Sequence, residues 1–125
     1  MTKRTRLWLV IGITVLAVVF VISIPIYKSV VLRAKETVLK ENLLTMRRVI
    51  KQYSKDKQQP PRSLQDLVEA GYFRQLPIDP VTNSNSTWMP LGEGVVAPGQ
   101  TERGITDVHS GSSSISSNGT AYNSW

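Results

Sequence analysis

The sequence predicts an α+β protein in which one long N-terminal helix packs on a small antiparallel sheet. Three observations lead to this fold class. Residues 7–26 form an apolar run without a single charge, an apolar stripe at helical spacing follows without a breaker before Pro60, and two short strand-like segments lie in the last third of the chain. The 125 residues are enough for one small domain and an anchor.

The charge of the chain is unevenly distributed. The net charge is +6, but Lys3, Arg4 and Arg6 precede the apolar run, the stretch 28–57 is strongly basic, and residues 58–125 carry more acids than bases. The basic character therefore belongs to the N-terminus and to one helix. Cysteine is absent, which excludes a disulfide framework and thiolate chemistry.

The apolar run predicts a transmembrane helix over residues 7–27, after a basic N-terminal segment at 1–6. Twenty helical residues span about 30 Å, the thickness of a hydrocarbon core. Leu7 begins the run, while Trp8 and Tyr27 stand near its two ends, where amphipathic rings prefer the membrane interface. Pro25 lacks an N–H and is expected to bend or loosen the helix.

A cleaved secretory signal is the alternative interpretation of this run. Its apolar core would be shorter, and small residues would follow around a cleavage site. The run here is longer and is followed by Pro25-Ile26-Tyr27-Lys28. We therefore predict an uncleaved anchor. Basic residues flank both ends, so counting Lys and Arg alone does not set the orientation.

An amphipathic helix is predicted over residues 28–57. Its apolar positions recur at steps of four, three, four and three residues, which places them on one helix face. These residues are Leu39, Leu43, Met46, Ile50 and Tyr53. We expect the stripe to pack against a small sheet, because it is shorter than the three or four heptads of a coiled coil.

The basic side chains of this helix fall mostly off the apolar stripe. A solvated face is the simpler interpretation, and no aromatic residues interleave with the cations to form a stacking platform for nucleic acid. A nucleic-acid partner is therefore not favoured. Arg47 and Arg48 belong to this face and are candidates for pairing with the acidic part between Asp66 and Asp107 of a neighbouring subunit.

Residues 58–125 are predicted to form a small α+β head. Pro60-Pro61 ends the long helix, and Ser63 with Asp66 resembles a capping box for a short helix from Leu64 to Ala70, which Gly71 ends. The segments 87–91 and 104–108 are expected strands, with a hairpin loop over 92–103. The Ser/Gly/Asn-rich residues 110–123 are expected to form an ordered loop, held by the aromatic side chains of Tyr122 and Trp125.

No constellation of catalytic residues is apparent. His109 is the single histidine, and Asp107 lies on the same side of the expected strand, but no nucleophile elbow accompanies them. No phosphate-binding loop, dinucleotide fingerprint, zinc spacing or spaced acid pair occurs. We therefore expect His109 to cap a strand or turn, and we predict that the chain is not an enzyme.

The order of the predicted segments along the chain resembles that of a known family. In chain order, the matching pieces are Ile24-Pro25-Ile26-Tyr27, Arg33-Ala34-Lys35, Ser63-Leu64-Gln65-Asp66-Leu67, Gly71-Tyr72, Leu76-Pro77-Ile78-Asp79-Pro80 and the closing Trp125. In this arrangement the chain resembles the type II secretion pseudopilins, especially the major, G-type pseudopilin, and more broadly the type IV pilin-like proteins. The resemblance covers nearly the whole chain, and its most specific piece is the block from Pro61 to Pro80.

The chain departs from the family pattern at its N-terminus. Aligned on Pro25, it has Lys3 where the prepilin leader ends in glycine, Arg4 where phenylalanine follows, and Trp8 where a glutamate stands. It therefore lacks the usual prepilin cleavage motif and the glutamate. In the family that glutamate is thought to pair with a neighbour's N-terminal amine inside an apolar bundle. A subunit without it is expected to join such a bundle differently or not at all.

The resemblance implies a pilin-like fold and a role in assembly. It implies a pseudopilin-like subunit of a type II secretion or type IV pilus-like assembly, whose partners are other pseudopilins and the inner-membrane secretion platform. The implied location is the bacterial inner membrane, with a single pass, a cytoplasmic N-terminus and a periplasmic C-terminal domain. Major pseudopilins hold calcium in the C-terminal loop; here Asp107 is the acidic candidate, but the rest of that loop is mostly neutral, so we predict no bound metal or cofactor.

A different class of function remains open from the residues alone. A non-polymerising, membrane-anchored binding module would use the basic face of residues 28–57 for DNA or an anionic surface. Steep salt dependence of DNA binding would distinguish this module from an assembly subunit.

Overall fold

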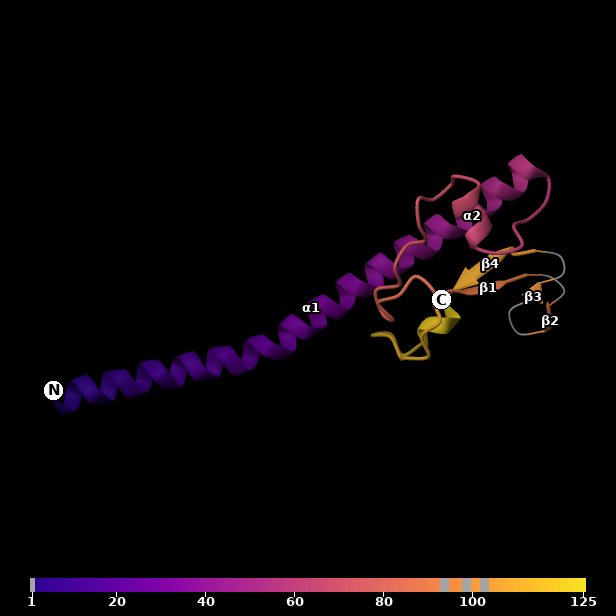
Figure 1. The fold of residues 1–125 in the computed structure, drawn as a ribbon. Helices are drawn as coiled ribbons and strands as arrows, with labels where there is room; N and C mark the ends of the chain where they lie inside the picture. Colours follow the sequence, from indigo (N-terminus) through magenta and orange to yellow (C-terminus); the bar gives the residue numbers. More distant parts are fainter. Residues whose placement is uncertain (1, 93–94, 98–99, 102–103) are drawn as a thin grey trace. The chain divides into compact units, whose positions relative to one another are not determined.

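The computed structural model describes residues 2–92, 95–97, 100–101 and 104–125. The element order is α1 (Lys3–Lys57), α2 (Gln65–Glu69), β1 (Met89–Leu91), β2 (Val95–Ala97), β3 (Gln100–Thr101), β4 (Asp107–His109) and the 3₁₀ helix η1 (Tyr122–Ser124). One long helix followed by short antiparallel strands is an α+β arrangement, as the sequence predicts (Figure 1).

Helix α1 is 55 residues long and runs through both the predicted transmembrane segment and the predicted amphipathic segment. It begins at Lys3, inside the expected N-terminal segment, and the Thr2 hydroxyl accepts a hydrogen bond from the Thr5 N–H at 3.4 Å. Pro25 lies within the helix without ending it. The helix ends at Lys57, and Gln58 follows with a φ of 56°.

The chain divides into two compact units, one reaching to Ala34 and one from Lys35 to Trp125. The second half of α1 is therefore part of the same unit as all the strands. The predicted amphipathic segment begins at residue 28, seven residues before this boundary.

Helix α2 is shorter by one residue at each end than expected, because Leu64 and Ala70 are its flanking residues. The expected capping arrangement forms around it. The Asp66 N–H donates to the Ser63 hydroxyl at 3.3 Å, and the Ser63 N–H donates back to the Asp66 carboxylate at 3.3 Å. Gly71 then takes a φ of +84°, the left-handed conformation that ends helices most easily at glycine.

Strands β1 and β4 pair antiparallel, with Met89 opposite His109 and Leu91 opposite Asp107. Both strands begin later than expected, and β4 extends one residue beyond Val108. The expected hairpin loop at 92–103 contains a second antiparallel pair, β2 with β3. The rest of that predicted loop, residues 93–94, 98–99 and 102–103, lies outside the described residues.

The core lies where the second half of α1 meets α2, β1, β4 and the C-terminal segment. Leu39, Leu43, Met46 and Ile50 are at most 2% exposed, and Tyr53 packs against them as a half-buried side chain. The other buried apolar side chains are Leu64, Leu67, Trp88, Ile105, Val108 and Tyr122. The apolar stripe of α1 is thus the helix's contribution to one small core.

The C-terminal segment 110–125 is ordered against this core. Tyr122 is 2% exposed, and its ring meets that of Trp125 edge-on with centroids 5.1 Å apart. The segment also buries three serines, Ser110, Ser112 and Ser116. The expectation of an ordered loop held by its aromatic end is met by this packing.

Candidate functional site

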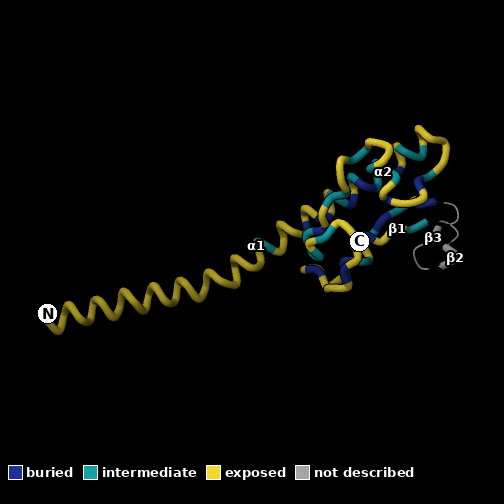
Figure 2. Tube along the Cα trace, viewed as in Figure 1, coloured by how far each residue is buried: buried dark blue, intermediate teal, exposed yellow. Residues whose placement is uncertain are grey.

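The first half of α1 exposes its apolar side chains. From Thr2 to Ala34 no residue is buried and only Val31 is half-buried (Figure 2). The helix is long and apolar enough there to cross a membrane. These features are consistent with single-pass anchoring, because exposed apolar surface of this extent is unfavourable in water.

The predicted anchor residues share this exposure. Leu7 is 59% exposed, Trp8 is 72% exposed and Tyr27 is 71% exposed. Thr14 and Ser23 are the polar residues of the run, and each hydroxyl donates to the backbone carbonyl four residues earlier, at 2.8 Å and 2.7 Å. Each hydroxyl is therefore satisfied within the helix, as a hydrocarbon environment requires.

The central polar contact of the second unit is a buried carboxylate on α1. Glu36 is 6% exposed and accepts three hydrogen bonds from the C-terminal segment. The Ser117 N–H donates at 2.7 Å, the Ser117 hydroxyl at 2.5 Å and the Tyr122 hydroxyl at 2.8 Å. This group of contacts, here called the Glu36 clamp, ties residues 117–122 to the helix.

The clamp stabilises the ionised carboxylate. Burial by itself raises the pKa of Glu36, but the Ser117 and Tyr122 hydrogen bonds and the nearby Lys40 ammonium outweigh it, so that the pKa lies below the ordinary value. On the other side of the clamp, burial and the bond to Glu36 raise the pKa of Tyr122 to about 12. Both groups are thus held in their neutral-pH forms.

Glu36 is not among the residues predicted from the sequence, although the sequence contains a signal for it. Glu36 stands three residues before Leu39 and so extends the apolar stripe by one position. An acid at a core-facing position needs hydrogen-bond donors inside the fold, because burying an unpaired charge is costly. The serine and the tyrosine that supply them, Ser117 and Tyr122, lie 81 and 86 residues away.

A second polar cluster joins α1 to β4. The Arg47 guanidinium donates from Nε to Asp107 Oδ1 at 2.7 Å and from Nη2 to the Val108 carbonyl at 2.9 Å. His109 Nε2 lies 3.4 Å from the other Asp107 oxygen, and its Nδ1 lies 2.9 Å from the Asn123 carbonyl. His109 therefore links β4 to η1, which is a capping role.

This cluster corrects one expectation. Arg47 was expected to be available to the acidic part of a neighbouring subunit, but it binds Asp107 of its own chain. The pairing costs little desolvation, because the two side chains are 30% and 42% exposed. Arg48, the next residue, stays exposed.

Asp107 is held in its ionised form by its neighbours. Burial by itself raises the pKa of the Asp107 carboxyl. The hydrogen bonds from the Val108 N–H and the Arg47 guanidinium lower it by more, so the pKa lies below its usual range. Among the described residues, no group of three or more His, Asp or Glu side chains comes together as metal ligands. The two oxygens of Asp107 already face Arg47 and His109, so this geometry does not favour Asp107 as a calcium ligand.

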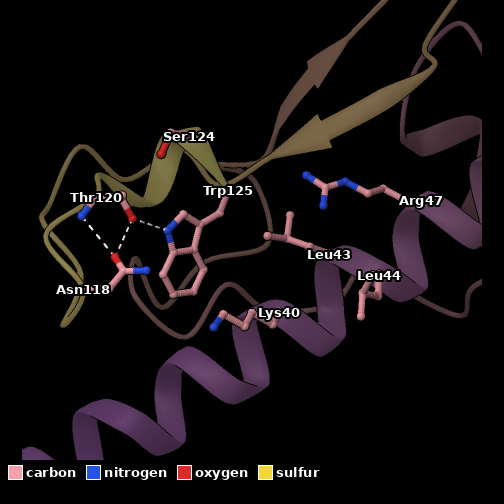
Figure 3. Close-up of a pocket in the computed structure, with 8 residues that line it drawn as sticks. All are labelled: Lys40, Leu43, Leu44, Arg47, Asn118, Thr120, Ser124 and Trp125. Atoms are coloured by element: carbon pink, nitrogen blue, oxygen red, sulfur yellow. Dashed lines mark hydrogen bonds between the residues drawn. The ribbon is translucent and has the colours of Figure 1, made fainter.

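An open groove lies beside these clusters, within the second unit. It has a volume of about 500 Å³ and separates α1 from the C-terminal segment (Figure 3). Lys40, Leu43, Leu44 and Arg47 line it from the helix, and Asn118, Thr120, Ser124 and Trp125 line it from the other side. Below, this surface is called the Trp125 groove.

Comparison of the chain with protein-family models, with curated proteins and with solved structures finds no match. The resemblance to the pseudopilins therefore stays a prediction from the residues and motifs quoted above.

Proposed function

We propose that this chain is a pseudopilin-like subunit of a type II secretion or type IV pilus-like assembly. In this proposal the apolar half of α1 anchors the subunit in the membrane and packs laterally against the helices of other subunits. The unit from Lys35 to Trp125 is the head that meets neighbouring heads or cargo. The role is structural, and we propose no catalytic activity.

One observation carries the proposal. A single helix provides a long, wholly exposed apolar surface in its first half and the core stripe of a small α+β head in its second half. A membrane-rooted assembly supplies both lipid and neighbouring helices for that surface.

The location proposed with this function is the bacterial inner membrane, with the N-terminus in the cytoplasm and the head in the periplasm. Lys3, Arg4 and Arg6 favour an inside N-terminus, although basic residues also follow Tyr27. Cysteines placed at Thr2 and Asn85 test the orientation in intact spheroplasts with a membrane-impermeant maleimide. The Asn85→Cys chain should be labelled and the Thr2→Cys chain should be protected; the reverse pattern would refute the topology.

Lateral packing is testable because the natural chain has no cysteine. Single cysteines at 13, 14, 15 and 16 sample all faces of the apolar helix, since successive positions turn by about 100°. In native membranes, oxidation should produce covalent dimers or adducts with other pilin-like subunits at one or more of these positions. Asn85→Cys, exposed on the head, is the matched control for random collision. A chain that stays monomeric at all four positions would argue against assembly.

A non-polymerising anchored binding module is the second candidate function. It is favoured by exposed cations along the second half of α1, namely Lys35, Lys40, Arg48, Lys51 and Lys55. The full chain in a neutral detergent should then shift duplex DNA in a gel, with affinity falling steeply as salt rises. Absence of a shift at low salt would eliminate the DNA form of this candidate.

A further inference from the structure

The Trp125 groove has an apolar floor. Leu43 is buried beneath it, while Leu44 is 54% exposed, although it belongs to the half of α1 that carries the core. The Trp125 ring covers the opposite side and is only half-buried. An apolar side chain of a ligand placed between Leu44 and Trp125 would remove apolar surface from water on both sides.

The position of Trp125 is fixed from several directions. Its indole N–H donates to the Thr120 hydroxyl at 2.8 Å (Figure 3). Its ring also meets that of Tyr122 edge-on. The Lys40 ammonium lies 4.8 Å from the centre of the Trp125 ring. The aromatic wall of the groove is thus pre-organised, which lowers the entropic cost of binding.

The rim of the groove is positively charged. Lys40 and Arg47 are both on it, and none of the eight lining residues is acidic. A neighbouring hollow of about 550 Å³ shares Arg47 and Trp125 and adds Lys51. Its one acid, Asp107, pairs with Arg47 and offsets that charge, so Lys40 and Lys51 carry the excess of positive charge. Taken together, the two hollows present an excess of positive charge around an apolar floor.

The side of the groove formed by the C-terminal segment carries an oriented side-chain amide, that of Asn118. Asn118 Oδ1 accepts hydrogen bonds from the Thr120 N–H at 3.1 Å and the Thr120 hydroxyl at 2.6 Å. This fixes the amide, whose Nδ2 has no hydrogen-bond partner among the described residues. Nδ2 is therefore a donor available to a ligand's carbonyl.

We propose that the Trp125 groove binds an acidic peptide segment of a partner protein. An apolar side chain of the segment would lie between Leu44 and Trp125, its carboxylates would face Lys40 and Lys51, and a backbone carbonyl would accept from Asn118. Charge complementarity selects an acidic partner, and the mixed apolar and hydrogen-bonding lining favours a peptide. An anionic lipid headgroup would use the cations but leave the floor and the amide donor unused. The proposal does not depend on lateral assembly of the apolar helix.

The test measures binding of the fluorescein-labelled peptide amide Glu-Asp-Leu-Phe-Asp-Glu to the full chain in a neutral detergent. Binding is measured by fluorescence anisotropy at low ionic strength. Amidation leaves only side-chain carboxylates. Saturable binding is expected, and Lys40→Glu or Leu44→Asp should each weaken it at least about fivefold. Both side chains are exposed, so the core should tolerate these changes. Lys40 also helps to stabilise the Glu36 carboxylate, so unchanged hydrogen exchange of residues 117–122 is required of the Lys40→Glu chain. Lys57→Glu, an equal charge reversal outside the groove on the same helix, should change affinity less than about twofold.

Several results would overturn the proposal. One is a lack of saturable binding up to about 1 mM peptide. A dissociation constant above that concentration would mean a binding free energy too small for a specific site. Another is an equal loss in Lys40→Glu and Lys57→Glu, which would indicate a diffuse charge effect. Equal binding of the Gln/Asn analogue of the peptide would remove the role of the carboxylates. A further contrary result is complete displacement of the peptide by vesicles that contain anionic lipid, together with unchanged vesicle binding by the Leu44→Asp chain. That result would assign the cations to a membrane surface.

Discussion

The two halves of α1 are both helical, but one leaves its side chains exposed and the other buries several of them in the core. From Lys3 to Ala34 the helix is almost wholly apolar in its middle and buries no side chain. From Lys35 to Lys57 it carries more charge, yet it buries Glu36, Leu39, Leu43, Met46 and Ile50. The more hydrophobic half is thus the more exposed half within this chain.

This contrast shows that hydrophobicity alone does not place a helix in a protein core. The second half has a narrow apolar stripe, which matches one face of a small head and leaves the other faces to solvent. The first half is apolar on every face, so a single small head would leave most of it exposed. Under the proposed function, lipid and the helices of other subunits bury it.

The largest effect is expected from charges placed in the middle of the apolar half. The double substitution Leu16→Arg with Val19→Arg should oppose membrane insertion by about 6 kcal/mol, from roughly 3 kcal/mol per central Arg. We expect the protein to leave the membrane fraction on alkaline extraction, which immunoblotting of the pellet measures. The double substitution to Ala at the same positions is the control and should stay in the pellet. Retention of the Arg chain would show that this half is not a membrane span.

A matched pair of leucines measures the contrast in packing. Leu39→Ala should destabilise the head by about 3 kcal/mol, because it leaves a cavity in the core. Leu9→Ala, in the exposed half, should change the same unfolding free energy by less than about 0.5 kcal/mol. Urea unfolding of the full chain in detergent, followed by the fluorescence of the buried Trp88, gives both values. Similar losses in the two variants would mean that the halves do not differ in packing as described.

A smaller effect is expected from the Glu36 clamp. Glu36→Gln keeps the shape of the side chain but loses the charge that its three donors stabilise, which should cost about 1–2 kcal/mol. Hydrogen exchange of residues 117–122 should accelerate, since these residues are held by the clamp. Glu41→Gln, an exposed acid on the same helix, is the control and should have little effect. Unchanged exchange in Glu36→Gln would show that the loop is held by other contacts.

The clamp also predicts the sign of the pH dependence. The folded state holds the Glu36 proton less tightly than the unfolded chain, because its pKa is below the ordinary value of 4.5. Its stabilisation is therefore complete above that pH and is lost as pH falls through the lower native pKa. The pKa of Tyr122 rises from 10.0 to about 12, so its contribution is present below pH 10 and is lost as pH rises toward 12. In urea titrations, Glu36→Gln should flatten the acid limb of the wild-type profile; an unaltered acid limb would contradict the assignment.

Much of the fold could be predicted from local patterns. The steps between Leu39 and Ile50 placed the core face of α1, and the Ser63–Asp66 pair with Gly71 placed the short helix α2 to within one residue at each end. These signals lie within a few residues of one another. They act through helix geometry and capping, which need no knowledge of the rest of the chain.

The candidate site was harder to predict, because its partners are far apart in sequence. Arg47 was expected on a solvated face, yet it reaches an acid 60 residues later. The Trp125 groove combines α1 with the C-terminal segment, and nothing in either segment alone indicates the other. The serine-rich composition of residues 110–117 suggested a neutral loop, but did not reveal that Ser117 would hold a buried carboxylate.

The sequence by itself determined the long helix, the change along it from uniformly apolar to two-faced, and the helix face that packs in the core. These follow from hydrophobic periodicity and from the backbone preferences of proline and glycine, which act over a few residues. Only the tertiary structure decided which polar groups are buried and with whom they pair, as for Glu36, Ser117 and Tyr122. The reason is that a buried polar group is stabilised by donors brought to it by the fold, and their distance along the chain leaves no local pattern.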